Sequence, residues 1–162
     1  MTVTPQSGFI SVGLLGGNRG EPLAAAVRRR RVELLTSIHE FERAIAVPSA
    51  DPDWRRHVAR RLVALRQAFS EHIEVTEGQD GLYAELLVVA PRLARAVGVL
   101  VREHLMIART LDRFADRLDE LDVAVERLRG WATDLLRELS RHRQRGADLV
   151  YEAYATDIGG ET

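Results

Sequence analysis

The stretch LARAVGVLVREHLMIARTLDRFADRL, residues 93–118, decides the fold of this chain. Its apolar positions recur in alternating steps of four and three residues, which is the period of one face of an α-helix. They are Leu93, Val97, Leu100, Ile107, Leu111, Phe114 and Leu118. His104 takes the one position in this series that no apolar side chain fills. The stretch therefore predicts a long amphipathic helix with a histidine on its core-facing side.

Two further segments have the same period, and each has a histidine at a core-facing position. In residues 54–77, the apolar series leads through Phe69 to His72. In residues 121–154, it leads through Leu139 to His142. Burial of one imidazole requires only a hydrogen-bond partner, but three imidazoles on separate helices indicate that the side chains converge on one site.

Residues 22–46 form a fourth segment with the period of a helix, and Pro22 is of a type favoured in a first helical turn. We expect Gly78 to end the second long helix in a left-handed conformation. A short helix is expected at residues 82–89, before Pro91 opens the third long helix. The pattern predicts an all-α fold, an up-down-up-down four-helix bundle with a short extra helix between the second and third long helices.

Length and composition fit one folded domain. With 162 residues, 46% of them hydrophobic, the chain can bury one core, and we expect a single domain at residues 21–162 after a flexible arm at residues 1–20. The absence of cysteine excludes disulfides, thiolate metal ligands and cysteine nucleophiles. A net charge of -1 gives no field that recruits nucleic acid or a membrane surface, and no segment reaches the ~18 apolar residues of a membrane span. We expect a cytoplasmic protein that contacts neither nucleic acid nor membrane.

Short sequences from each long helix carry a resemblance to a known family. They are Ser37-Ile38-His39-Glu40, then Glu71-His72-Ile73-Glu74-Val75-Thr76-Glu77 ahead of Gly81-Leu82-Tyr83, then Glu103-His104, and last His142 with Asp148. In this order they resemble the bacterial hemerythrin-like family, the HHE cation-binding domains, over nearly the whole chain after residue 20. The resemblance implies a four-helix bundle that holds iron, in full form two irons bridged by carboxylates and an oxygen atom, with dioxygen bound at an open position. The metal ligands that it implies are His72, His104, His142, Glu77, Asp148 and His39.

The sequence departs from the family pattern at three positions. Thr76 stands four residues after His72, where the family has a carboxylate, and Glu77 lies about 140° around the helix from His72 at ~100° per residue. Ala108 replaces a second histidine of its helix, and Gly146 stands one turn after the last histidine, so that the following aspartate is displaced. These departures predict a ligand set that is thinned or shifted relative to a complete di-iron centre. Three further carboxylates are candidates to orient the imidazoles by hydrogen bonds: Glu74, Glu103 and Glu138.

Two hypotheses of different classes follow, and the sequence leaves both open. In the first, the chain is a hemerythrin-like, non-haem iron-binding protein that handles dioxygen, nitric oxide or peroxide, or senses iron. In the second, the site has lost its metal, and the helices serve as a scaffold or bind a protein partner that the sequence does not identify. The three inward histidines favour the first, whereas His39 fits a ligand and a residue at the edge of the core equally well. Weak peroxidase- or catalase-like turnover is a third interpretation, although we do not expect an enzyme.

Overall fold

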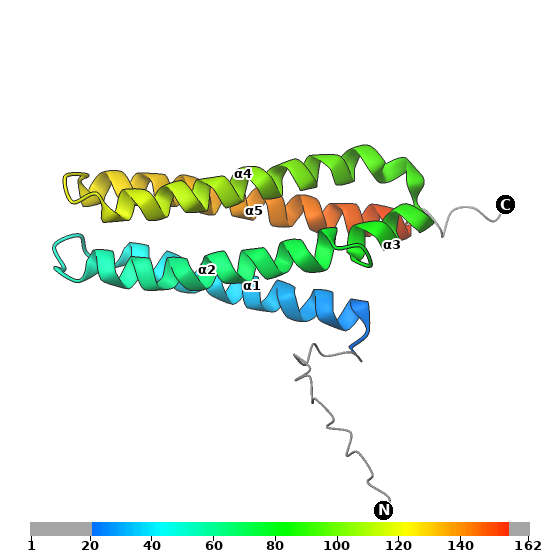
Figure 1. Ribbon diagram of the computed structural model, residues 1–162, viewed down its shortest axis with the longest axis horizontal. Helices are drawn as coiled ribbons and strands as arrows, with labels where there is room; N and C mark the ends of the chain where they lie inside the picture. The colour runs from blue at the N-terminus through cyan, green and yellow to red at the C-terminus, as the bar shows by residue number, and fades with distance from the viewer. Residues whose placement is uncertain (1–20, 156–162) are drawn as a thin grey trace, which may run out of the picture.

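The computed structural model describes residues 21–155, which contain helices and no strand. Residues 1–20, expected to be an arm, and residues 156–162 lie outside the described part. Four helices are long and lie side by side along the long axis of the molecule (Figure 1). They are α1 (Leu23–Ala46), α2 (Trp54–Glu77), α4 (Ala94–Asp119) and α5 (Val125–Ala155). The predicted all-helical fold with four long helices is confirmed.

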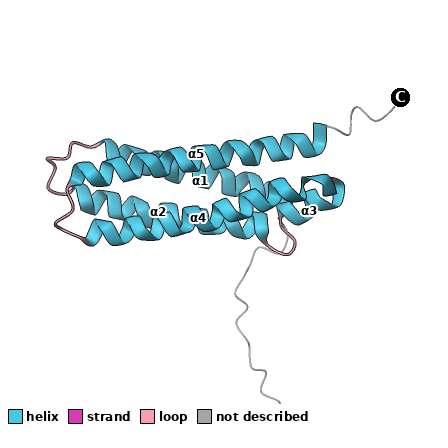
Figure 2. Cartoon of the chain, turned by 90° about the horizontal axis from the view of Figure 1, so that it is seen from above, coloured by secondary structure: helices cyan, strands magenta, loops and turns pink. Residues whose placement is uncertain are grey.

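Two short elements connect α2 to α4. The helix α3 (Leu82–Val89) has the predicted bounds, and the 3-10 turn η1 (Pro91–Leu93) follows it. Proline suits the first position of such a turn because its missing N–H would have no partner there. Both views place α3 at the end of the molecule opposite to the loops that join α1 to α2 and α4 to α5 (Figures 1 and 2).

The predicted left-handed conformation of Gly78 is wrong. Its φ is -54°, and no glycine in the described residues has a positive φ. The Gly78 N–H instead donates to the Glu74 carbonyl oxygen at 3.0 Å, and the chain then leaves the helix in an extended conformation. A Cβ at Gly78 would lie 2.6 Å from the same carbonyl oxygen. Close approach to the last turn of α2, rather than a left-handed backbone, therefore requires glycine here.

The helix α5 begins at Val125 rather than near Leu121, because residues 121–122 form a turn. Arg55 of α2 reaches this loop and donates to the Leu118 carbonyl oxygen at 2.9 Å and to the Glu120 carbonyl oxygen at 3.2 Å. The last carbonyls of a helix have no partner within the helix, so this arginine satisfies groups that water would otherwise solvate. The side chain thereby joins the α4–α5 loop to α2.

Apolar packing forms two buried clusters along the molecule, with the three inward histidines between them. The larger cluster joins all four long helices and includes Phe69 and Leu139. The smaller cluster gathers around α3 and includes Tyr83 and Leu100. The polar layer thus interrupts an otherwise apolar core. None of the helices in residues 21–155 is long and apolar enough to cross a membrane.

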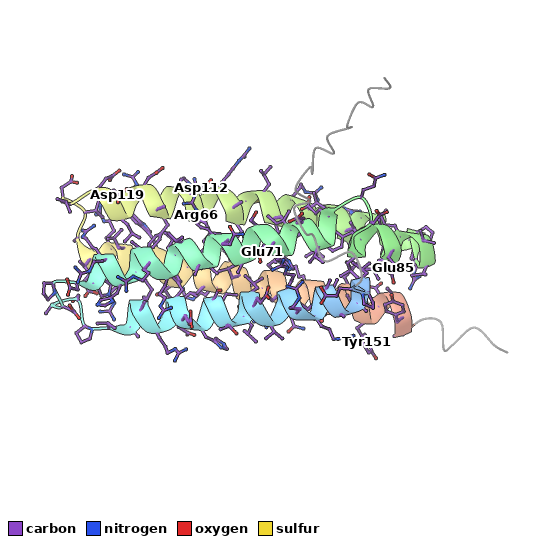
Figure 3. The ribbon with its side chains drawn as sticks, turned by 60° about the horizontal axis from the view of Figure 1, so that its bottom comes forward. Arg66, Glu71, Glu85, Asp112, Asp119 and Tyr151 are labelled. Carbon is purple, nitrogen blue, oxygen red and sulfur yellow. The ribbon has the colours of Figure 1, made fainter. Side chains whose placement is uncertain are left out.

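Ion pairs on the surface also join α2 to its neighbours. Arg66 of α2 pairs with Asp112 of α4, and the two residues lie next to each other in Figure 3. Arg61 of α2 pairs with Glu40 of α1 at 3.0 Å. Exposed pairs of this kind contribute about 0–1 kcal/mol each, whereas burial of one large apolar side chain contributes about 1.5–3 kcal/mol. The apolar core therefore dominates the association of the helices.

Candidate metal centre

The three predicted histidines converge from three helices. His72 of α2, His104 of α4 and His142 of α5 each offer one nitrogen, and these nitrogens lie within 4.8 Å of one another. The centroids of the His104 and His142 rings are 4.6 Å apart, and each lies within 5.6 Å of the His72 ring. All three are buried, with relative exposures of 9%, 1% and 3% in sequence order. The three histidines lie close enough to hold one metal ion.

Aromatic packing fixes the orientation of the three rings. Phe69, one turn before His72, lies 5.8 to 6.1 Å from the centroids of all three imidazoles. Tyr83 of α3 stacks on the His104 ring at 5.9 Å with an interplanar angle of 13°. These contacts close the site on its apolar sides and limit the rotation of the imidazoles.

Two carboxylates hold the outer nitrogens of two rings. Nδ1 of His104 donates to Oε1 of Glu77, and Nδ1 of His142 donates to Oε2 of Glu103 at 2.9 Å. A carboxylate can only accept, so we assign the ring proton of both histidines to Nδ1. Nε2 of each ring then carries a lone pair that faces the cluster. This is the arrangement in which protein histidines usually bind a metal.

Two buried nitrogens of the cluster have no hydrogen-bond partner among residues 21–155. They are Nδ1 of His72 and Nε2 of His104. Nε2 of His72 lies 3.4 Å from Nε2 of His142. Because the proton of His142 is on Nδ1, Nε2 of His72 donates this hydrogen bond and Nε2 of His142 accepts it. Leaving a buried polar atom unpaired costs about 1–3 kcal/mol. A cation bound at the centre would give Nε2 of His104 the partner that it lacks.

The environment keeps the three imidazoles neutral at neutral pH. Burial, together with the neighbouring His142, lowers the pKa of His72 to about 4. Burial and the other two imidazoles lower the pKa of His104 to about 3, and burial lowers the pKa of His142 to about 4. Neutral imidazoles with free lone pairs suit zinc, iron, copper and nickel, whereas magnesium and calcium prefer oxygen ligands. The donor set therefore fits a transition metal.

A cavity of about 250 Å³ opens beside two of the three histidines. It reaches His72 and His142 from the side where α1, α2, α3 and α5 meet. The remaining residues that line it are Arg31, Leu34, Thr76, Leu82, Tyr83, Arg143, Gly146 and Ala147. The cavity provides space for a small molecule beside the cluster.

The structure separates the six predicted ligands into three groups. His72, His104 and His142 form the cluster, while Glu77 contacts His104 from outside it. Asp148 is exposed and accepts a hydrogen bond from Gln144 at 2.8 Å, and His39 is exposed on α1. Ligation by these last two residues would require a different arrangement of their side chains.

The structure selects Glu103 from the three carboxylates predicted to orient imidazoles. Glu74 and Glu138 are both exposed, whereas the Glu103 side chain is largely buried and contacts His142. Thr76, which stands where the family has a carboxylate, donates to the His72 carbonyl oxygen at 2.8 Å within its own helix. Its hydroxyl therefore closes the last turn of α2.

No protein-family model, curated protein or solved structure matches this chain.

Proposed function

We propose that this protein is a hemerythrin-like, non-haem iron-binding protein with an up-down-up-down four-helix bundle. It holds one iron ion between Nε2 of His104, Nε2 of His142 and a nitrogen of His72, and it handles or senses dioxygen, nitric oxide or peroxide. Glu77 and Glu103 orient two of the imidazoles and increase their basicity. Within residues 21–155 the cluster consists of histidines without a carboxylate that would bridge a second iron, so the proposal is one metal ion per chain.

The observation that carries this proposal is the combination of convergence with hydrogen bonding. Glu77 of α2 holds His104 of α4, and Glu103 of α4 holds His142 of α5. Each carboxylate thus fixes a histidine of the neighbouring helix with its Nε2 lone pair inward. A purely structural imidazole needs no such orientation, because either nitrogen could serve its packing role.

The protein residues around the site have defined tasks. Phe69 and Tyr83 exclude water from the rings, and the depressed pKa values of the histidines keep the lone pairs available. Three protein ligands leave positions open on a metal ion. Iron bound there would offer an open position to dioxygen, nitric oxide or peroxide. The cavity beside His72 and His142 gives such molecules access.

Metal analysis tests the proposal directly. The protein is purified without chelator and its iron, zinc, copper and nickel are measured by mass spectrometry, after which the metal-free form is titrated anaerobically with Fe(II). We expect one iron per chain and a visible absorption band when nitric oxide is added to the Fe(II) form. The variant His104→Ala should lose this iron, whereas His57→Ala, which removes an exposed histidine, should retain it.

One contact favours a second function, in which the protein is a scaffold that binds no metal. The hydrogen bond between the Nε2 atoms of His72 and His142 partly satisfies the cluster without a metal. In that case Fe(II), Zn(II) and chelator would all leave the melting temperature unchanged. Iron bound at two per chain would instead support a di-iron centre and would contradict the one-metal proposal.

A further inference from the structure

The cavity beside the histidine cluster has a positively charged wall. Arg31 of α1 and Arg143 of α5 line it, and its ten lining residues include no carboxylate. Elsewhere in the described residues, Arg30 and Arg145 pair with the carboxylates of Glu71 and Glu103. The side chains of Arg31 and Arg143 form no hydrogen bond or ion pair within residues 21–155.

The two arginines line the same cavity as His72 and His142, so an anion in the cavity would lie close to both guanidinium groups and to the histidine cluster. Leu34, Leu82 and Ala147 form much of the remaining wall. An apolar wall lowers the local dielectric constant and strengthens the attraction between a guanidinium group and an anion.

The volume of the cavity restricts its occupant. A water molecule occupies about 30 Å³ in the liquid, so about 250 Å³ accommodates several waters or an anion of a few heavy atoms. Gly146 helps to keep this space open. A Cβ at Gly146 would meet no atom within 4 Å, so this position, which lines the cavity, has room for a side-chain atom.

We propose that this cavity binds a small oxyanion of the carboxylate or phosphate class. Arg31 and Arg143 bind its oxygens through guanidinium N–H groups, whose planar geometry matches two oxygens of such an anion. Contact of a further oxygen with a metal ion beside His72 and His142 rests on the proposed function, whereas the arginine contacts do not. The site thereby selects anions over neutral molecules of the same size.

Isothermal titration calorimetry with acetate and with inorganic phosphate tests the proposal on metal-loaded and metal-free protein. We expect at least one of the two anions to bind both forms, more tightly with metal, and its affinity to fall as ionic strength rises. The double variant R31Q/R143Q should weaken binding at least tenfold. The double variant R28Q/R141Q, which removes two exposed arginines from the same two helices, should leave the affinity unchanged.

A second pair of variants tests the place of binding. Gly146→Val should weaken anion binding by occupying part of the cavity, whereas Gly130→Val, at an exposed glycine of the same helix with equally open surroundings, should not. Failure of both anions to bind wild-type protein would overturn the proposal, as would equal losses in the test and control variants. A chain that binds the anion but no metal would refute only the proposed function.

Discussion

Acid should unfold the metal-free protein over the pH range in which its buried histidines would take up protons. In the folded state the pKa is about 4 for His72 and His142 and about 3 for His104, against an ordinary value of 6.5. Because these pKa values are depressed, the unfolded chain binds more protons than the folded protein between pH 6.5 and about 4. The free energy of unfolding therefore falls as the pH falls through this range.

The expected size of the effect follows from the number of protons. Each proton taken up on unfolding changes the free energy of unfolding by about 1.4 kcal/mol per pH unit, so three histidines give at most about 4 kcal/mol per pH unit. Burial raises the pKa of the Glu77 carboxyl, so this group increases the free energy of unfolding as the pH falls. Its effect is smaller than that of the histidines, because it is a single group and they are three. A typical domain has a total stability of about 5–15 kcal/mol, so we expect the folded state to be lost before pH 4.

Urea unfolding of the metal-free protein, followed by circular dichroism at several pH values from 7 to 4.5, measures this slope. The variant His104→Leu, which removes the most strongly depressed imidazole, should flatten it. His57→Ala, at an exposed position, should leave it unchanged. A free energy of unfolding that stays constant between pH 6.5 and pH 4.5 would refute the reasoning, because it would mean that the three imidazoles are not buried in neutral form.

Three other predictions concern the residues that contact the histidines and the effect of metal on stability. Glu103→Gln removes the charge that holds Nδ1 of His142 and should weaken metal binding by ~10–100-fold in a chelator competition assay, whereas Glu138→Gln, at an exposed carboxylate, should not. Phe69→Ala should lower the free energy of unfolding by about 3–5 kcal/mol in urea, because Phe69 is buried against all three imidazoles; a loss below about 1 kcal/mol would show that the layer repacks. Metal at a hundredfold excess over its dissociation constant should stabilise the protein by about 2.7 kcal/mol in calorimetry, and a reversible transition unaffected by metal would contradict binding to the folded state.

Much of the fold could be predicted from the sequence because apolar periodicity and chain-breaking residues agree. The bounds of α2 and α3 are as predicted, since Pro52 lies before α2, Gly78 lies between the two helices and Pro91 follows α3. The start of α5 is shifted because Leu121 has the right spacing for the apolar face but lies in a turn. Periodicity identifies which side of a helix is apolar, but it does not identify the residue at which the helix begins.

At the site, periodicity likewise predicted the inner side of each helix but not the contacts between helices. The apolar series placed three histidines on the inner sides of three helices, and inner sides of packed helices must meet. The apolar series does not locate the carboxylates, because each of them accepts a hydrogen bond from a histidine of another helix. Glu103 is adjacent to His104 in sequence but holds His142, and Glu77, displaced around α2 from His72, is thereby turned toward His104 of α4. Spacing within one helix does not reveal such partners, since they depend on which helices are neighbours.

His72 differs from the other two histidines in a way that connects the proposed metal site with the cavity. His104 and His142 each have a carboxylate on Nδ1, whereas Nδ1 of His72 has no hydrogen-bond partner in the part of the chain that the structure describes. His72 also lines the cavity that Arg31 and Arg143 line, and the positive charges of these arginines oppose a bound cation. An oxyanion in the cavity would neutralise these charges and add negative charge beside His72 and His142. Metal and anion should therefore bind cooperatively, each increasing the affinity for the other by the same factor.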